Sequence, residues 1–179
     1  MVLPIVFYGN KLLRARCAEV VEITPWIRQL VADMIETMDA KNGIGIAAPQ
    51  VGHSLRIFVL RNYIEVEDKT ELSPPQVYIN PKILHKSEET CIETEGCLSI
   101  PGIREEVERP VSITIEAMDL EGNHFTEELS GYNARVRMHE NDHINGVLFI
   151  DRIHPIRRKK IAHFLKQIEE RHGKKSHRL

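Results

Sequence analysis

Apolar residues recur every three or four positions in the segment that follows Thr24. They fall at Ile27, Leu30, Val31, Met34, Ile35 and Met38. Because an α-helix has 3.6 residues per turn, this spacing predicts an amphipathic helix with one buried face, to which the methionines belong. Thr24-Pro25 is typical of a helix start, since threonine can cap the first turn and proline fits its first position. Asn42-Gly43 predicts its end.

A different pattern follows, in which short runs are rich in β-branched and aromatic residues. These runs occupy residues 55–60, 77–79, 111–117 and 125–129. In the third run, Val111, Ile113 and Ile115 alternate with polar residues, which predicts a strand with one face in the core and one in water. Residues 119–123 have the composition of a hairpin turn between the last two runs. Residues 64–75, with five charges and Pro74-Pro75, predict an exposed loop.

Two more helices are predicted in the last third of the chain. One begins near Asn133 and stops at Asn145-Gly146. The other begins near Pro155 and ends at Gly173. Its apolar face consists of Ile161, Phe164, Leu165 and Ile168. A helix, then antiparallel strands, then two helices is an α+β pattern, because it lacks the strand–helix alternation of a doubly wound sheet.

Length and composition indicate one domain over residues 1–179, large enough to bury about 70% of its unfolded surface. The absence of an apolar run of 18 residues excludes a helical membrane span. The apolar stretch 3–8 is too short for the core of a signal peptide. Three cysteines are too few for a disulfide framework, and we expect Cys17 and Cys91 to be small buried residues. We therefore expect a cytoplasmic protein.

The net charge of −2 conceals an asymmetry between the body and the C-terminal segment. Residues 152–179, the predicted C-terminal helix and tail, hold ten Lys and Arg against Glu169 and Glu170, a net charge of +8 that leaves −10 on the rest. A basic tail on an acidic body suggests an anionic partner. The alternative is a solvated helix face, which the charge count alone slightly favours. We expect neither a membrane partner nor sequence-specific binding of nucleic acid.

The segment 139–143, His-Glu-Asn-Asp-His, carries the clearest chemistry. On a helix, residues i and i+4 share one face, so His139 and His143 can reach one ion. Glu140 can then act as general base for water at that ion. A catalytic site of this kind needs three protein ligands and one open position, so a third ligand must come from elsewhere. The alternative is a surface helix with two unrelated histidines.

Three sources of the third ligand can be compared. One class of protease with this motif uses a third histidine, but Phe149 occupies its place and cannot bind metal. Glu169 or Glu170 could supply a carboxylate from a separate helix, although both lie in the basic segment. Cys97, which follows a glycine in a compact segment, is the better candidate. One cysteine with two histidines is soft enough for zinc or ferrous iron.

Three segments together resemble a known family. Residues 43–50, Gly-Ile-Gly-Ile-Ala-Ala-Pro-Gln, combine glycines that allow close backbone approach with a terminal amide. Residues 95–99, Glu-Gly-Cys-Leu-Ser, and residues 139–143 follow in order. Their order and spacing are similar to the three signature motifs of the peptide deformylases, and the resemblance covers residues 8–153. Two positions depart from it, Ile144 in place of leucine and Asn10-Lys11 in place of Asp-Pro, and neither touches the chemistry.

The resemblance implies a fold, an activity and partners. The fold would be α+β, with antiparallel strands packed around a central metal-binding helix and with an N-terminal and a C-terminal helix. The activity would be removal of the formyl group from the N-terminal formylmethionine of nascent polypeptides, with release of formate. N-formylmethionyl nascent peptides would be the substrate partner. The basic C-terminal helix could add contact with the ribosome.

The resemblance also implies roles for named residues. One divalent metal ion per chain would be held by Cys97, His139 and His143, with water as the fourth ligand. Ferrous iron would be native, and Zn²⁺ or Ni²⁺ could replace it. Glu140 would act as general base and then as acid, while Gln50 and the Leu98 N–H would stabilise the oxyanion. The substrate would be bound by the backbone near Gly45 and Gly96 and by a methionine pocket of Ile44, Leu98, Tyr132, Val136 and His139.

Helix geometry supports part of this pocket independently, because Val136 and Tyr132 precede His139 by three and seven residues and share its face. In the family, the position of Arg104 pairs with that of Glu95 and braces the cysteine segment. A surface arginine is the alternative reading of Arg104. Two other functions remain as alternatives, an endopeptidase with a different third ligand and a non-catalytic metal-stabilised module that binds ribosomes through the basic tail.

Overall fold

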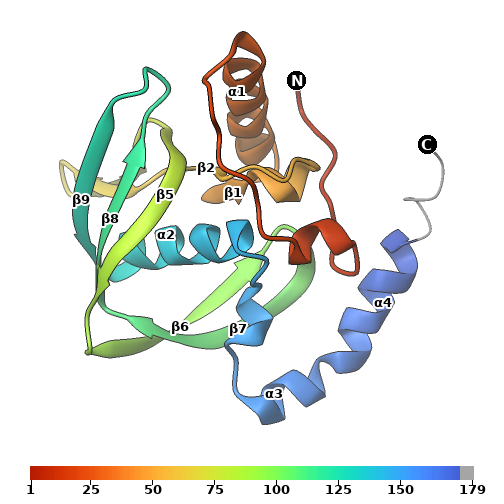
Figure 1. Cartoon of the computed structure of the whole chain (residues 1–179). Coiled ribbons are helices and arrows are strands. Elements are labelled where there is room, and N and C mark those ends of the chain that lie inside the picture. Colours follow the sequence, from red (N-terminus) through yellow and green to blue (C-terminus); the bar gives the residue numbers. More distant parts are fainter. Residues whose placement is uncertain (174–179) are drawn as a thin grey trace.

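The structure is a computed structural model that describes residues 1–173 (Figure 1). The helices are η1 (Lys11–Arg14), α1 (Pro25–Ala40), η2 (Ala48–Val51), α2 (Gly131–Ile144), η3 (Phe149–Asp151), α3 (Pro155–Lys160) and α4 (Ala162–Gly173). The strands are β1 (Gly45–Ala47), β2 (Ile57–Leu60), β3 (Tyr63–Val66), β4 (Lys69–Leu72), β5 (Gln76–Lys86), β6 (Thr90–Cys97), β7 (Ile100–Pro110), β8 (Ser112–Met118) and β9 (His124–Ser130). Three basic residues of the predicted tail, Lys174, Lys175 and Arg178, lie outside the described residues.

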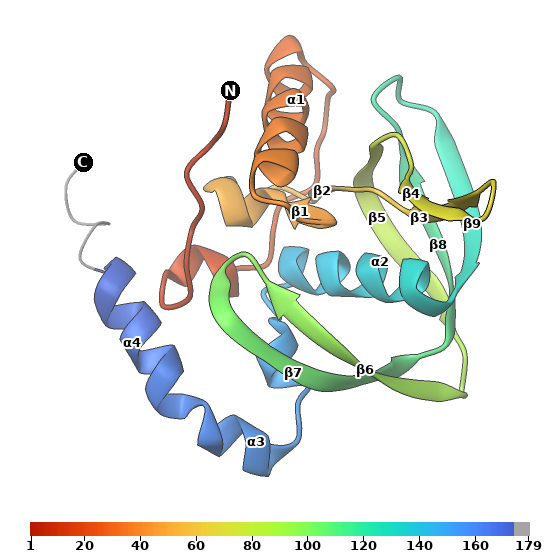
Figure 2. The ribbon, with the colours of Figure 1, turned by 180° about the vertical axis from the view of Figure 1, so that it is seen from behind.

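The strands are all antiparallel and form one five-stranded sheet, in the order β1-β2-β5-β8-β9, and two hairpins, β3–β4 and β6–β7. Helix α2 runs through the middle of the molecule, between the large sheet and the β6–β7 hairpin, as both ribbon views show (Figures 1 and 2). The predicted α+β fold, with antiparallel strands around a central helix and with helices near both ends, is confirmed.

Strand β2 shows how the sequence produces this layering. Its four residues are all fully buried, because the strand lies between two helices. Phe58 and Leu60 belong to the core shared with α2, whereas Ile57 and Val59 belong to the core shared with α1. Side chains alternate along a strand, so a strand buried on both faces carries an unbroken apolar run instead of an alternating one.

Helix α1 forms as the pattern predicts. The Thr24 hydroxyl accepts a hydrogen bond from the Ile27 N–H at 3.2 Å, and Pro25 takes the first helical position. Met34 and Met38 are fully buried in the core, as expected. The second helix begins two residues before its predicted start, at Gly131, and ends as predicted, before Asn145-Gly146.

The segment predicted as an exposed loop is a hairpin. Strands β3 and β4 pair through four residues each, and every one of these residues is exposed. Glu67 and Asp68 form the turn, with φ of 47° and 61°. Because neither face of this hairpin is buried, its charged residues follow no alternating pattern, and the strands could not be recognised from hydrophobicity.

The long β6–β7 hairpin was not predicted at all. Along β7 the buried positions alternate regularly, but they include Glu105 and Arg109 as well as Ile103 and Val107. These charged residues point inward because each has an ion-pair partner, Arg157 for Glu105 and Glu95 for Arg109. Inward polar residues remove the apolar alternation by which a strand is recognised.

The C-terminal helices and one cysteine differ from what the sequence predicted. The predicted third helix is two helices, which meet at Ile161. Ile161, Leu165 and Ile168 are buried as predicted, but Phe164 is 49% exposed and packs on the neighbouring His163 ring instead. Cys17 is buried as expected, whereas Cys91 is only partly buried, beside a guanidinium nitrogen of Arg135 at 3.5 Å.

The N-terminal segment joins distant parts of the molecule. The Val6 N–H donates to the Gln50 carbonyl at 2.8 Å, and the Tyr8 N–H donates to the Ser99 carbonyl at 2.9 Å. Between these two residues, the Phe7 ring stacks on His172 of α4 at 3.9 Å between ring centroids. Within residues 1–173, no helix combines the length and the apolar character needed to cross a membrane.

Gly146, just after the end of α2, has no room for a side chain. Gly146 has a φ of +73°, and a β-carbon there would lie 2.3 Å from the Arg14 carbonyl oxygen. We expect Gly146→Ala to lower the free energy of unfolding by more than about 3 kcal/mol, because backbone overlap adds to the conformational strain. The matched control is Gly52→Ala, with φ of +93° but no atom within 4 Å, which should cost about 1 kcal/mol. Urea unfolding measures both, and equal losses would contradict the packing argument.

Candidate metal centre and peptide pocket

Helix α2 presents two histidines to the centre of the molecule. His139 and His143 are one helical turn apart, so their side chains lie on the same face. The side chain of His139 is 11% exposed, and His143 is buried. The Nδ1–H of His139 donates to Oε1 of Glu95 at 2.8 Å, which leaves Nε2 free to bind an ion.

Cys97 approaches the two histidines from the end of β6. A register shift after Gly96 pairs Cys97 with Ile100, so the chain turns tightly at the thiol. The Cys97 Sγ lies 3.4 Å from Nε2 of His143. One ligand atom from each of Cys97, His139 and His143 fits within 4.8 Å of the others. A thiol and two imidazoles so close together are a donor set suited to a divalent zinc or iron ion.

The charges around the two histidines also fit a bound cation. Burial lowers the pKa of His139, but its hydrogen bonds with Cys97 and Glu95 outweigh burial and hold that pKa well above its usual value. Groups that favour a proton on this ring favour a metal ion in the same place. Burial, together with the charges of His139 and Arg109, holds the pKa of His143 well below its usual value, so that ring is neutral and can act as a ligand.

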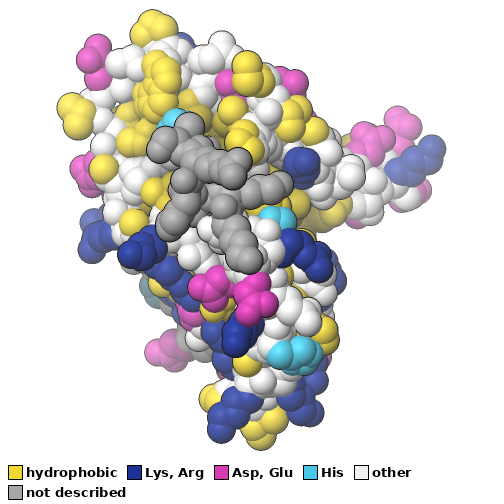
Figure 3. Space-filling model, turned by 90° about the vertical axis from the view of Figure 1, so that its right-hand side faces the viewer, with side chains coloured by type: hydrophobic (Ala, Val, Ile, Leu, Met, Phe, Trp, Pro, Cys, Tyr) yellow, Lys and Arg dark blue, Asp and Glu magenta, His cyan; other side chains and the backbone are white. Residues whose placement is uncertain are grey.

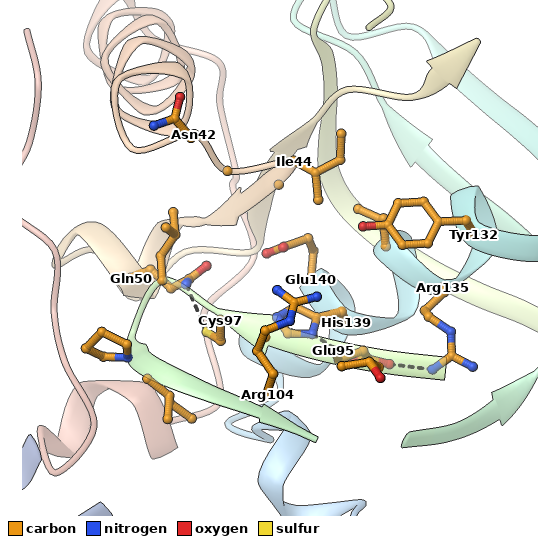
Figure 4. Close-up of a pocket in the computed structure, with 18 of the residues that line it drawn as sticks. Asn42, Ile44, Gln50, Glu95, Cys97, Arg104, Tyr132, Arg135, His139 and Glu140 are labelled. Atoms are coloured by element: carbon orange, nitrogen blue, oxygen red, sulfur yellow. Dashed lines mark hydrogen bonds and ion pairs between the residues drawn. The ribbon is translucent and has the colours of Figure 1, made fainter. Parts of the chain in front are cut away.

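Glu95 holds the cysteine strand against the histidine helix. Its carboxylate accepts hydrogen bonds from Arg109 at 2.6 and 2.9 Å, from Arg135 at 2.7 Å and from His139 (Figure 4). Burial favours the protonated acid, yet the hydrogen bonds from Arg109 and His139 hold the pKa of Glu95 well below its usual range. A second carboxylate, that of Asp142, accepts a hydrogen bond from the Nη1 of Arg109 at 2.9 Å. The network therefore connects β6, β7 and α2.

Glu140, the neighbour of His139 on α2, also lines the pocket. Its carboxylate packs on Gly45, where a β-carbon would lie 2.7 Å from Oε1, so only a glycine leaves room for it. The other oxygen, Oε2, is buried and has no hydrogen-bond partner among residues 1–173. Burial raises the pKa of Glu140 to about 7. A buried carboxylate oxygen without a partner is costly unless water, an ion or a ligand completes its hydrogen bonds.

Gln50 is fixed at the edge of the same space. Its Oε1 accepts a hydrogen bond from the Ala47 N–H at 2.9 Å. This contact directs the Nε2 donors to the Cys97 Sγ at 3.5 Å and to the Ser99 Oγ at 3.2 Å. Gln50, Cys97, His139 and Glu140 face the same part of the pocket in Figure 4. A fixed amide donor near a cluster of candidate metal ligands can stabilise negative charge on a bound molecule.

A cavity of about 720 Å³ opens beside these residues. It brings together nearly every residue that the sequence predicted for the site: Ile44, Gly45, Gln50, Glu95, Gly96, Cys97, Leu98, Arg104, Tyr132, Val136, His139 and Glu140. The remaining predicted residue, His143, is 1% exposed and lies in contact range of the Cys97 sulfur. The volume of this cavity is in the range of known small-molecule and peptide sites.

One predicted contact is wrong. Arg104 does not pair with Glu95 in the structure, because Arg109 and Arg135 occupy that carboxylate. Arg104 is the β-ladder partner of Gly96, and its Nη1 lies 3.2 Å from where a β-carbon of that glycine would stand. Arg104 is exposed and lines the pocket, as the alternative reading of a surface arginine expected.

Sequence reasoning missed three residues that organise the site, Arg109, Arg135 and Asp142. Two signals could have found part of this set. Arg135 stands four positions before His139, and Asp142 stands within the His-Glu-Asn-Asp-His segment, so both lie on the helix that was recognised. For Arg109 there was no such signal, because its strand was not predicted.

Comparison with known proteins identifies the family. The family model described as Polypeptide deformylase matches residues 2–159. A peptide deformylase of Pseudothermotoga lettingae is 41% identical over 174 residues, which cover 95% of this chain and 96% of the relative. A peptide deformylase of Acinetobacter baumannii is 42% identical over 166 residues, which cover 93% of this chain and 91% of the relative.

Solved structures agree with this result. A peptide deformylase structure from Plasmodium falciparum has a TM-score of 0.86 and 35% identity, and the match covers 98% of this chain and 99% of that chain. An Acinetobacter baumannii structure with Met-Ala-Ser bound has a TM-score of 0.79 and 36% identity, and covers 86% of this chain and 99% of that chain. With a family model matched over most of its length and relatives this similar, the chain belongs to the peptide deformylase family.

Proposed function

We propose that the chain carries out the reaction of its family, removal of the formyl group from N-terminal formylmethionine, with the residues that line its central pocket. The observation that carries the proposal is the Oε2 of Glu140, which is buried without a hydrogen-bond partner among residues 1–173, together with the nearby cluster of Cys97, His139 and His143. A buried acid with a free oxygen next to a metal-binding cluster has the arrangement needed for proton transfer during hydrolysis of an amide.

Cys97, His139 and His143 would hold one divalent metal ion. When bound, this ion would supply a Lewis acid and lower the pKa of water at the site. Glu95 supports two of the three ligands. It keeps the proton of His139 on Nδ1, and it belongs to the strand that carries Cys97. The network of Arg109 and Arg135 around Glu95 would keep the three ligand side chains in place.

The remaining residues would act on the substrate. Glu140 would take a proton from the attacking water on its carboxylate and return it to the nitrogen that leaves as the free amine. The Gln50 Nε2 and the Leu98 N–H would donate hydrogen bonds to the oxygen of the formyl group as it becomes an oxyanion. Water therefore adds to the formyl carbon, the C–N bond breaks, and formate and the methionyl peptide leave.

The peptide would lie along the pocket as an added strand beside Gly45 and Gly96. Its methionine side chain would enter the space between Ile44, Tyr132 and Val136, all of which line the cavity. The Acinetobacter baumannii structure holds Met-Ala-Ser, the peptide that deformylation of formyl-Met-Ala-Ser would leave, which supports a short methionyl peptide as the ligand of this chain.

We further propose ferrous iron as the native metal, with zinc or nickel able to replace it, and a cytoplasmic location, where chains begin with formylmethionine. The ribosome is the proposed partner of the basic C-terminal helices. Figure 3 looks at the side of the molecule on which α3 and α4 lie. It shows Lys and Arg side chains gathered over the lower part of that side. Lys159, Lys160, Lys166 and Arg171 are exposed there, whereas Arg157 is engaged by Glu105 at 2.9 Å.

The first test concerns Glu140. We expect Glu140→Gln to bind metal like the parent but to lose about 10²- to 10⁴-fold in kcat, because an amide cannot take up the proton. Metal content and formate release from formyl-Met-Ala-Ser measure the two effects. Glu128→Gln, the same change at an exposed position of β9, is the control and should keep full activity. A Glu140→Gln enzyme that turns over at the parental rate would remove Glu140 from the reaction.

The second test concerns the metal. A thiolate ligand and ferrous iron are both open to oxidation. We expect enzyme loaded with Fe²⁺ to lose activity in air within a time over which the anaerobic sample is stable, while enzyme loaded with Ni²⁺ keeps its activity. Formate release followed over time measures this difference. Equal survival of the two forms in air would count against iron oxidation as the cause of loss.

The third test concerns the ribosome. We expect neutralisation of Lys159, Lys160 and Lys166 to glutamine to weaken binding to ribosomes by about tenfold, because contacts with phosphates depend on charge and salt. Neutralisation of Lys41, Lys82 and Lys86, which are exposed elsewhere, makes the same change in net charge and is the control. Co-sedimentation at two salt concentrations measures the binding. Equal pelleting of both variants would leave the basic surface as a solvated helix face.

A further inference from the structure

The chain contains two Asn-Gly pairs, Asn42-Gly43 and Asn145-Gly146, each just after the end of a helix. Asparagine is a thermolabile residue, because its side-chain amide can be lost. A following glycine favours this loss, since it has no β-carbon to keep its backbone nitrogen away from the amide carbon. The two pairs differ in how the structure holds the asparagine side chain.

The amide of Asn145 is held at both ends. Its Oδ1 accepts a hydrogen bond from Arg56 at 3.0 Å, and its Nδ2 donates to the Asn141 carbonyl at 3.1 Å. The side chain must leave both partners before its amide carbon can meet the nitrogen of Gly146. Loss of two exposed hydrogen bonds raises the barrier enough to slow the reaction by about tenfold.

The amide of Asn42 has no such restraint. The residue is exposed, and within residues 1–173 its side chain forms no hydrogen bond. Figure 4 shows it at the end of α1, apart from the network around Glu95. Its backbone is in the left-handed region, with φ of 55°, and its N–H donates to the Asp39 carbonyl at 3.1 Å. The backbone is therefore held while the side chain is free to rotate.

The glycine nitrogen is hydrogen-bonded in both pairs. The Gly43 N–H donates to the Met38 carbonyl at 2.9 Å, and the Gly146 N–H donates to the His143 carbonyl at 3.2 Å. Each of these bonds must open before the nitrogen can react. The difference between the pairs therefore lies in the asparagine side chains, and it favours reaction at Asn42.

We propose that Asn42 is a site of spontaneous deamidation that alters the pocket as the enzyme ages. The Gly43 nitrogen gives up its proton and bonds to the Cγ of Asn42. The side-chain nitrogen takes up a proton and leaves as ammonia, so a cyclic imide forms. Water then adds to either imide carbonyl and breaks its bond to nitrogen. Opening at the backbone carbonyl gives isoaspartate, in which the chain runs through the former side chain, and opening at the other carbonyl gives aspartate.

The altered residue lies next to groups assigned to the reaction. Asn42 and Gly43 both line the cavity, and they connect α1 to β1. Gly43 packs on Leu98, because a β-carbon on this glycine would lie 2.9 Å from the Leu98 Cδ1. Isoaspartate inserts an extra carbon atom into this connection and adds a negative charge. A shift of about 1 Å can cost about 10²-fold in rate, so we expect kcat/KM of the isoaspartate form to fall by about tenfold or more.

The test follows both Asn-Gly pairs in one sample. Parent enzyme loaded with Ni²⁺ is incubated without oxygen at mildly alkaline pH, and digests taken over time are measured by mass spectrometry for exchange of an amide for an acid. We expect Asn42 to convert about tenfold faster than Asn145. The kcat/KM for formyl-Met-Ala-Ser, normalised to bound nickel, should fall as the converted fraction of Asn42 rises. This loss of activity, unlike the conversion itself, rests on the proposed function.

Two variants connect the conversion with the loss. Asn42→Gly removes the amide and tolerates the positive φ, so its activity should stay constant over the same incubation. Asn145→Ala is the matched control, because it removes the amide of the other pair and should lose activity at the parental rate. Each variant is compared with its own activity before incubation, so a change in the amount of folded enzyme at the start does not matter.

The outcomes distinguish this inference from the proposed function. Loss of activity in the parent and in Asn145→Ala, absent from Asn42→Gly, with conversion concentrated at Asn42, supports the inference. An intact Asn42, or conversion of Asn145 at the same rate, overturns the site. Conversion of Asn42 at constant kcat/KM overturns its effect on the pocket. Fresh parent enzyme that releases no formate overturns the proposed function, while the mass spectra still decide whether Asn42 reacts.

Discussion

The carboxylate of Glu95 is the contact on which the geometry of the centre depends. It lies two residues before Cys97 on β6 and accepts a hydrogen bond from His139 on α2, so one group joins the two elements that carry the candidate ligands. Arg109 and Arg135 hold this carboxylate from two further directions. Because β6 and α2 are far apart in sequence, no local preference of the chain could bring the thiol and the imidazoles together without such a connection.

This arrangement places several charges in the interior, and the structure shows how they are tolerated. Arg109 lies between Glu95 and Asp142, and Asp142 also receives Arg152 at 2.7 and 2.8 Å. Glu95 and Asp142 thus each have more than one partner. Loss of a single member would leave another charge buried without a partner, which costs much more than an intact network contributes. The network therefore restricts the relative position of β6, β7 and α2 more than it adds to stability.

The parts of this protein that could be predicted from sequence are those in which one segment specifies its own structure. Thr24-Pro25 and the apolar stripe after it predicted α1, and the paired histidines predicted both a helix and a candidate metal site. Cys97 was expected beside the histidines as the best candidate for a third ligand. The other motif residues were expected to gather in one pocket only through the resemblance to a family, because the spacing of segments 43–50, 95–99 and 139–143 says nothing by itself about their separation in space.

The parts that could not be predicted depend on partners distant in the chain. Strand β7 points Glu105 and Arg109 inward, and these positions make sense only once Arg157 and Glu95 are known to face them. The β3–β4 hairpin was obscured for the opposite reason, since exposure of both faces leaves no pattern to read. Arg104 was assigned to Glu95 by resemblance, and the error became visible only when the competing arginines were placed.

The stacking of Phe7 on His172 has a consequence for the order in which the molecule can be completed. Phe7 belongs to the segment whose backbone binds Gln50 and Ser99, on either side of the candidate centre. During synthesis Phe7 leaves the ribosome early, but this contact cannot form until His172 has emerged as well. Contacts between such distant positions slow folding, because a long loop must close before they stabilise anything. Final consolidation around the pocket is therefore a late event, reached when most of the polypeptide has already been translated.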